Sequence, residues 1–222
     1  MWGFDPISLS TAAILVGMTG CDSHDSPRIE TITERAPIKY NNLLSSHQLE
    51  NFKIDTVSPY AAHEHAKVGG LMGGKINIST DINIAWSTNK FLKRSCFWFD
   101  DIKVILKTEP TIYIAREYRK GSCKYDKTME HEMRHVKEDL AIIKKYKPKF
   151  NAAVKKAVYS SGTIGPIPAS NENTTRQDMM KIIDKAINQV LDKMHKERRE
   201  RQQAIDSRKE YDRLSKVCHK KR

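Results

Sequence analysis

The sequence lacks the marks of several common protein classes. No stretch offers about 18 uninterrupted apolar residues, which excludes a polytopic membrane protein. No CxxC pair is present, which argues against a zinc-thiolate site, and the Walker Lys-Ser/Thr of a phosphate loop is also missing. Full disorder is excluded as well, because aliphatic and aromatic runs recur from residue 76 to 115. A length of 222 residues then predicts one globular domain with an appendage.

Acidic residues are in deficit. The chain has 39 Lys+Arg against 27 Asp+Glu, a formal net charge of +12. Such a surface favours anionic headgroups, cell-wall polymers or nucleic acid as partners. Because the charges are spread along the chain and no nucleic-acid motif is present, we expect a solvated basic surface and no specific nucleic-acid partner.

The N-terminus has the pattern of a lipoprotein signal. A short apolar stretch over residues 7–20 ends in Met18-Thr19-Gly20-Cys21, which resembles the bacterial lipobox. The pattern predicts a signal peptide at 1–20, a lipid on Cys21 that anchors the chain to the membrane, and a polar tether at 21–37. The expected location is the bacterial cell envelope, on its periplasmic or extracellular face. The alternative is a buried N-terminal helix that precedes a cysteine.

Hydrophobic periodicity indicates an α+β protein. Apolar residues at even positions from Ile76 to Trp86 alternate with polar ones, and β-rich runs follow, so residues 74–118 predict a small antiparallel sheet. The glycines at 69–74 suggest a flexible flap. His63 and His65, just before them, are more typical of an exposed loop than of a second metal site.

Two helical regions follow the predicted sheet. A helix begins at Asp126, a good N-cap, and is expected to end at Pro148, with a shorter helix after it. Residues 172–217 contain no Gly or Pro and predict one long amphipathic helix. The resulting boundaries are a catalytic domain at 38–170 and a long charged helix at 171–222 that packs on it.

Four cysteines are present. Cys96 and Cys123 bracket two predicted strands, and a hairpin would bring them together, so we expect a disulfide between them. With a lipid on Cys21, Cys218 is then left over.

The motif with the clearest chemical meaning is His131-Glu132-Met133-Arg134-His135, which is HExxH. On a helix, residues i and i+4 lie on one face, so His131 and His135 are able to share one Zn²⁺. Glu132 lies on the same turn, where a carboxylate can take a proton from a water on the metal. The alternative is a basic helix with two surface histidines.

A third ligand is expected, since catalytic zinc usually has three protein ligands. No HxxGxxH continuation is present, which excludes the long metzincin motif. Glu197 is the leading candidate, because it extends the apolar stripe of the last helix with a charge; Glu200 and Glu138 are alternatives. Glu138 and Asp139 are otherwise expected to orient an imidazole. The last helix also offers His195, Asp206 and Asp212.

Residues 76–217 resemble a bacterial family of predicted secreted zinc-dependent proteases. The resemblance consists of the strands around Trp86, the pair Cys96 and Cys123, the HExxH helix, and Tyr211-Asp212 in a charged helix. The Thr-x-His-Gly that often follows in the family is replaced by Ser215-Lys216-Val217-Cys218. The resemblance implies a zincin-like fold, with a sheet over the active-site helix and substrate along the sheet edge.

The expected function is therefore an envelope-anchored zinc metallopeptidase that hydrolyses peptide bonds. Glu132 is the expected base, and Tyr211 is a candidate for stabilising an oxyanion. Peptides or proteins are the expected substrates, with the peptides of cell-wall cross-links as a further option. The alternative is a non-catalytic envelope lipoprotein with a zincin-like binding domain.

Overall fold

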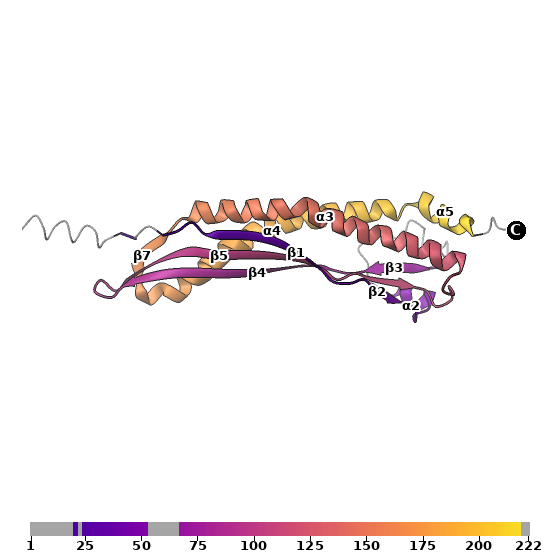
Figure 1. Cartoon of the computed structure of the whole chain (residues 1–222), viewed down its shortest axis with the longest axis horizontal. Helices are drawn as coiled ribbons and strands as arrows, with labels where there is room; N and C mark the ends of the chain where they lie inside the picture. The colour runs from indigo at the N-terminus through magenta and orange to yellow at the C-terminus, as the bar shows by residue number, and fades with distance from the viewer. Residues whose placement is uncertain (1–19, 22–23, 53–66, 219–222) are drawn as a thin grey trace, which may run out of the picture. The chain divides into compact units, whose positions relative to one another are not determined.

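The computed structural model describes residues 20–21, 24–52 and 67–218 as an α+β protein with small sheets and long helices (Figure 1). The elements in chain order are β1 (Arg28–Arg35), β2 (Lys39–Asn41), α2 (Ser46–Glu50), β3 (Gly70–Gly73), β4 (Ile76–Asn89), β5 (Arg94–Thr108), β6 (Thr111–Ile114), α3 (Cys123–Ser161), β7 (Ile164–Pro168), a 3-10 turn (Ala169–Asn171), α4 (Glu172–Ile205) and α5 (Arg208–Val217). The chain divides into two compact units, and α3 and α4 contribute to both.

Unit 1 comprises residues up to 31, 80–104 and 150–189. It contains most of β4 and β5, in a sheet of order β1-β5-β4 with β7 paired antiparallel to β5. Its core is apolar and comes from β5, α3 and α4. The largest of its fully buried side chains are Phe97, Phe99, Phe150, Ile102, Met179 and Ile183.

Unit 2 comprises residues 32–79, 105–149 and 190–222. Its three-stranded sheet has the order β2-β6-β3, with β2 parallel and β3 antiparallel to β6. Ile112 and Ile114 of β6 pack with Val136 of α3, so this sheet lies against the HExxH helix. The predicted single sheet over residues 74–118 is corrected to two, because β4 and β5 lie in the first sheet and β6 in this one, where β2 adds a parallel strand.

The helix α3 does not end at Pro148, as the sequence predicted, but continues to Ser161. A proline inside a helix leaves the carbonyl four residues earlier without its amide partner. Pro148 and Lys144 are both exposed, so water can satisfy that carbonyl. The two predicted helices are therefore one.

The last helical region, predicted as one helix over 172–217, is two helices. The first, α4, ends at Ile205, and α5 begins after Ser207, whose extended backbone has φ −79° and ψ 149°. Asp206 lies in the break between them. This interruption has no Gly or Pro signal, and it places a carboxylate at a helix junction instead of on a continuous surface.

The disulfides are Cys21–Cys96 and Cys123–Cys218. The predicted Cys96–Cys123 link is wrong, because Cys96 bonds to Cys21 and Cys123 bonds to Cys218. The sulfur of Cys21 is the atom that a lipid would need, so the disulfide also replaces the predicted lipid attachment and leaves no spare Cys218. Two disulfides are typical of an oxidising extracellular or periplasmic location.

Two N-terminal predictions fall partly on β-structure. Residues 28–35 of the expected tether form β1, and the expected glycine flap contains β3. The signal sequence, His63 and His65 lie outside the described residues. Within the described ranges, none of the helices combines the length and hydropathy that a bilayer span requires.

Candidate metal centre

The HExxH sequence lies within α3, as the periodicity predicted. His131 and His135 are 3% and 6% exposed, and Glu132 is 4% exposed. The turn that carries them belongs to the part of α3 that packs on β6, through Val136. The two histidines are therefore buried neighbours on one helix face and not idle surface groups.

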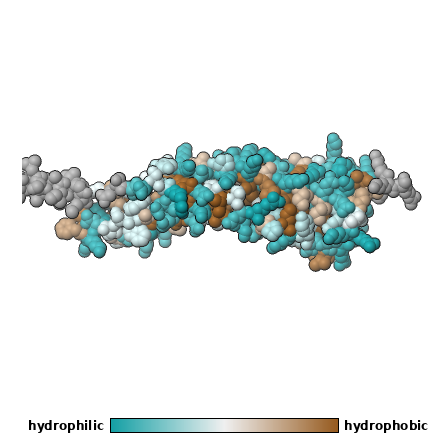
Figure 2. All heavy atoms as spheres, viewed as in Figure 1, coloured by the Kyte–Doolittle hydropathy of each residue, from teal (hydrophilic) through white to brown (hydrophobic). Residues whose placement is uncertain are grey.

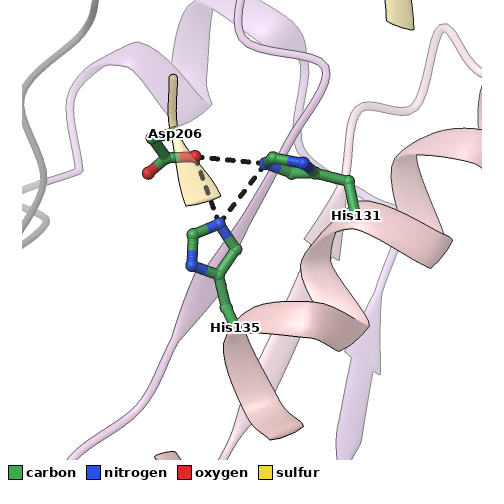
Figure 3. A group of neighbouring side chains, drawn as sticks. All are labelled: His131, His135 and Asp206. Atoms are coloured by element: carbon green, nitrogen blue, oxygen red, sulfur yellow. Dashed lines mark hydrogen bonds and ion pairs between the residues drawn. The ribbon is translucent and has the colours of Figure 1, made fainter. Parts of the chain in front are cut away.

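Asp206 completes a buried group with the two histidines (Figure 3). Its Oδ1 is 3.1 Å from the Nε2 of His131 and 3.1 Å from the Nε2 of His135. The two Nε2 atoms are 3.3 Å apart. Three potential ligand atoms thus converge on one point, two from α3 and one from the junction between α4 and α5.

The spacing of these atoms suits a small divalent cation. Ligands bound at 2.0–2.2 Å to a tetrahedral Zn²⁺ lie roughly 3.3–3.6 Å apart. The observed separations of 3.1–3.3 Å are only slightly tighter. Two imidazoles and a carboxylate are also donors that zinc accepts, so the residues present fit the ion that the sequence predicted.

Hydrogen bonding on the far side of His135 fixes its tautomer. The Gln202 amide nitrogen donates to the His135 backbone carbonyl at 3.1 Å and to Asp139 Oδ1 at 2.7 Å. The Gln202 oxygen therefore faces His135 Nδ1, which must carry the hydrogen and donate it. The lone pair of a neutral His135 is then on Nε2, directed at Asp206 and His131.

In that tautomer, His135 Nε2 and Asp206 Oδ1 are both hydrogen-bond acceptors, and they face each other. A cation or an additional proton between them would remove this conflict. The lone pair on His135 Nε2 is 3.1 Å from a carboxylate oxygen in a buried site. Burial opposes the charged form of His135, yet the hydrogen bond and charge of Asp206, with Glu132 and Gln202, raise its pKa above the ordinary value. The group is built to hold positive charge.

A second carboxylate supports His131. The Nδ1 atom of His131 is buried without a hydrogen bond, and its neighbour Glu210 Oε1 is 3.5 Å away. Arg213 and Arg134 hold Glu210 at 2.8 and 2.5 Å. Bonding to Arg213, followed by the charges of both arginines, lowers the pKa of Glu210 to about 2. A carboxylate that the two arginines keep ionised near neutral pH thus lies behind His131, as is common behind metal-binding histidines.

Glu132 lies between the histidines and strand β3. Burial raises its pKa to about 7, although both histidines and the Met72 backbone N–H favour its charged form. A Cβ on Gly70 would lie 2.4 Å from Thr128 and 3.2 Å from Glu132 Oε1, so only glycine permits β3 to approach α3 this closely. The carboxyl is therefore held at the sheet edge beside the two histidines.

Tyr211 lies at the centre, but its hydroxyl is engaged. It donates to Asp206 Oδ1 at 3.2 Å, and its ring meets His131 edge to face with centroids 5.7 Å apart. Tyr211 thus contacts the carboxylate that would bind a metal, a different position from the oxyanion role expected from the sequence.

The expected third ligand, Glu197, is not in the group. Its carboxylate bonds to Lys145 at 2.6 Å and to Tyr146 at 2.9 Å, and it pairs with Arg201. These partners lower its pKa to about 2, with the Lys145 bond as the largest cause. The prediction of Glu197 is corrected to Asp206, because Glu197 meets α3 at Lys145 and Tyr146, whereas Asp206 meets it at the two histidines.

The two acids expected to orient an imidazole have different partners. Glu138 pairs with Arg201 at 2.6 Å and does not contact either histidine. Asp139 contacts His135 only through Gln202: Asp139 accepts a hydrogen bond from the Gln202 amide, and the Gln202 oxygen accepts one from His135. Arg198 in turn clamps Asp139 at 2.6 and 3.0 Å. Sequence reasoning missed Gln202 and Arg198 altogether.

A periodic signal for these residues was nevertheless present. Steps of four from the buried Met194 reach Arg198, Gln202, Asp206 and Glu210, and all are less than a tenth exposed. Polar residues that continue an apolar stripe at this spacing face the same interior. Glu197, three residues after Met194, lies off that stripe.

Comparisons with protein-family models, with curated proteins and with solved structures find no match. What the centre can do therefore follows from its geometry and from the HExxH sequence.

Proposed function

We propose that this chain is a zinc-dependent metallopeptidase that acts outside the cytoplasm on peptides or proteins. The observation that carries the proposal is the buried group of His131, His135 and Asp206, with Glu132 on the same turn of α3. The resemblance of the HExxH helix and the late Tyr211-Asp212 to predicted secreted zinc-dependent proteases supports it. The two disulfides support the location.

Each residue has a distinct task in this proposal. His131, His135 and Asp206 hold the ion, and Zn²⁺ bound there supplies Lewis-acid activation of water and of a peptide carbonyl. Glu132 accepts the proton of the attacking water on its carboxylate and returns it to the leaving amine.

The remaining polar groups position the ligands. Gln202 holds His135 in the tautomer that frees Nε2, and Glu210 faces the other histidine. The Tyr211 hydroxyl already donates to Asp206. We therefore assign to Tyr211 the orientation of the Asp206 carboxylate and not the stabilisation of an oxyanion.

The test compares metal content with hydrolysis in matched variants of the full chain. Wild-type protein purified without chelators should contain zinc at one equivalent and cleave members of a fluorogenic peptide library. The Glu132→Gln variant should keep its zinc while hydrolysis falls by a factor on the order of 10² or more, because the amide cannot accept a proton. Wild-type protein that neither contains zinc nor takes it up on titration would refute the proposal.

A second candidate is a non-catalytic domain in which the metal ion links helices. The burial of His131, Glu132, His135 and Asp206 favours it, since each is at most 6% exposed. The Cys123–Cys218 disulfide, which joins α3 to the C-cap of α5, is a second link of the same kind. This candidate predicts zinc-dependent thermal stability without hydrolysis of any peptide. The Glu132→Gln variant would then resemble wild type in every measurement.

A further inference from the structure

The tip of the β4–β5 hairpin in unit 1 carries an exposed apolar residue among cations. Phe91 is 87% exposed, the highest value among the large exposed hydrophobic side chains of the described residues. Lys90 precedes it, and Lys93 and Arg94 follow, all exposed. Figure 2 shows an apolar projection beside hydrophilic atoms at this hairpin. Burial of this ring against an apolar phase would therefore remove apolar surface from water, and the cations lie beside it.

The backbone of this tip is held in place. Asn89 Oδ1 accepts hydrogen bonds from the backbone N–H groups of Phe91 and Leu92, each at 3.0 Å. The Lys93 carbonyl accepts from Ala169 N–H at 3.0 Å, and the Arg94 guanidinium donates to the Pro166 carbonyl at 3.2 Å. The projection of Phe91 is thus a fixed feature and not a result of fraying.

The sequence around Phe91 carries cations and no acidic residue. The sequence contains no Asp or Glu from residue 82 to 99. The nearby Glu172 carboxylate accepts hydrogen bonds from the hydroxyls of Ser95 at 2.7 Å and Thr88 at 3.3 Å. Lys90 and Lys93 line one open hollow, where two ammonium groups can meet an anion.

The covalent structure relates this tip to the N-terminal part of the chain. Cys21 follows the apolar residues 7–20 directly in the sequence. Its disulfide partner Cys96 is two residues beyond Arg94 on the same strand. The disulfide therefore ties Cys21 to the strand that carries the hairpin tip.

We propose that the β4–β5 hairpin tip docks onto the surface of an anionic lipid bilayer. Phe91 enters the interface, and Lys90, Lys93 and Arg94 face the headgroup phosphates. A single projecting aromatic ring with cations on both sides suits a soft, negatively charged surface, because a protein partner would require a complementary pocket. This docking is independent of the metal centre and survives failure of the proposed function.

Vesicle co-sedimentation with the full chain tests the proposal. The vesicles are phosphatidylcholine alone or with 30% phosphatidylglycerol, in low and high salt. Binding should require the anionic lipid and weaken with salt. Phe91→Ser should reduce the partition coefficient about tenfold, and Lys90→Gln about fivefold. Matched controls in unit 2 are Leu43→Ser, at a residue 78% exposed, and Lys75→Gln, which should change little.

Melting temperatures equal to wild type would show that the variants fold. Equal binding to neutral and anionic vesicles would overturn the proposal. So would a Phe91→Ser effect no larger than that of Leu43→Ser. Retention of all variants on a soluble polyanion, without any dependence on Phe91, would assign the cations to another anionic partner and also overturn it.

Discussion

The helices α3 and α4 each run through both units, and they bury different side chains in each. In unit 1 the buried positions are apolar: Phe150, Val154 and Val158 from α3, with Met179, Ile183 and Ile187 from α4. In unit 2 polar side chains are buried as well: His131, Glu132, His135 and Asp139 from α3, with Arg198 and Gln202 from α4.

The apolar residues of unit 1 are expected to stabilise the fold, and the buried polar residues of unit 2 are expected to serve the candidate metal centre. Apolar burial stabilises a fold at about 25 cal/mol per Å² without further arrangement. Buried polar groups have to be paired, and even well-paired ones often contribute less than an apolar core of similar volume. The chain of Arg198, Asp139, Gln202 and His135 is satisfied at each step, which is more organisation than helix packing requires. We therefore expect changes in unit 2 to alter metal binding and changes in unit 1 to alter stability.

The largest expected effect is the loss of metal from Asp206→Asn. The amide is neutral and a poor ligand, so zinc content should fall from one equivalent to near zero after dialysis. The matched control is Glu197→Gln, which neutralises an acid of α4 that bonds to Lys145 and not to the histidines. Elemental analysis measures both. Zinc retained in Asp206→Asn and lost in Glu197→Gln would restore the ligand that the sequence favoured.

The counterpart in unit 1 is Ile183→Ala. Ile183 is 0% exposed, so the substitution leaves a cavity and should lower the free energy of unfolding by about 2–5 kcal/mol. Denaturant unfolding measures this loss. The folded variant should still bind one equivalent of zinc. A variant that stays folded but loses its metal would show that the two regions are not separable as we describe.

A smaller effect is expected from Gln202→Leu, which keeps all three proposed ligands. Without the amide, His135 Nδ1 loses its acceptor and Asp139 loses a donor. Removal of such a supporting group typically lowers metal affinity 10–100-fold. Competition with a chromophoric chelator measures the change. An affinity equal to wild type would mean that the tautomer of His135 does not depend on Gln202.

The smallest effect concerns pH and Glu197. Its pKa is lowered to about 2 in the folded protein from an ordinary 4.5, so its ion pairs stabilise the fold above pH 4.5. That stability is lost as the pH falls from about 4.5 toward 2, because the carboxylate takes up a proton. The difference in unfolding free energy between wild type and Glu197→Gln should therefore shrink over this range. A constant difference would mean that the Lys145 and Arg201 pairs contribute nothing measurable.

Local patterns were sufficient for much of the fold. Alternation at Ile76–Ile84 predicted β4, and the sequence predicted helix on both sides of Pro148, where α3 runs. They failed at Pro148, where the helix continues because Pro148 and Lys144 are both exposed and water can bind the unpaired Lys144 carbonyl. They failed again at Asp206, where the chain breaks a helix without Gly or Pro.

Pairing between distant residues was beyond these patterns. Cysteine spacing favoured Cys96 with Cys123, yet the disulfide partners are 75 and 95 residues apart in sequence. In the same way, β2 was not expected, because its parallel partner β6 is about 70 residues further along the chain.

The sequence by itself determined the α+β class, the helical HExxH turn and its two histidines, since these depend on neighbours within four residues. Only the tertiary structure decided that Asp206 and not Glu197 joins them, that Gln202 orients His135, and which cysteines pair. The physical reason is range. Periodicity reports which face of a helix is buried, whereas a ligand set and a disulfide depend on where separate segments meet, and that is settled by the packing of the whole chain.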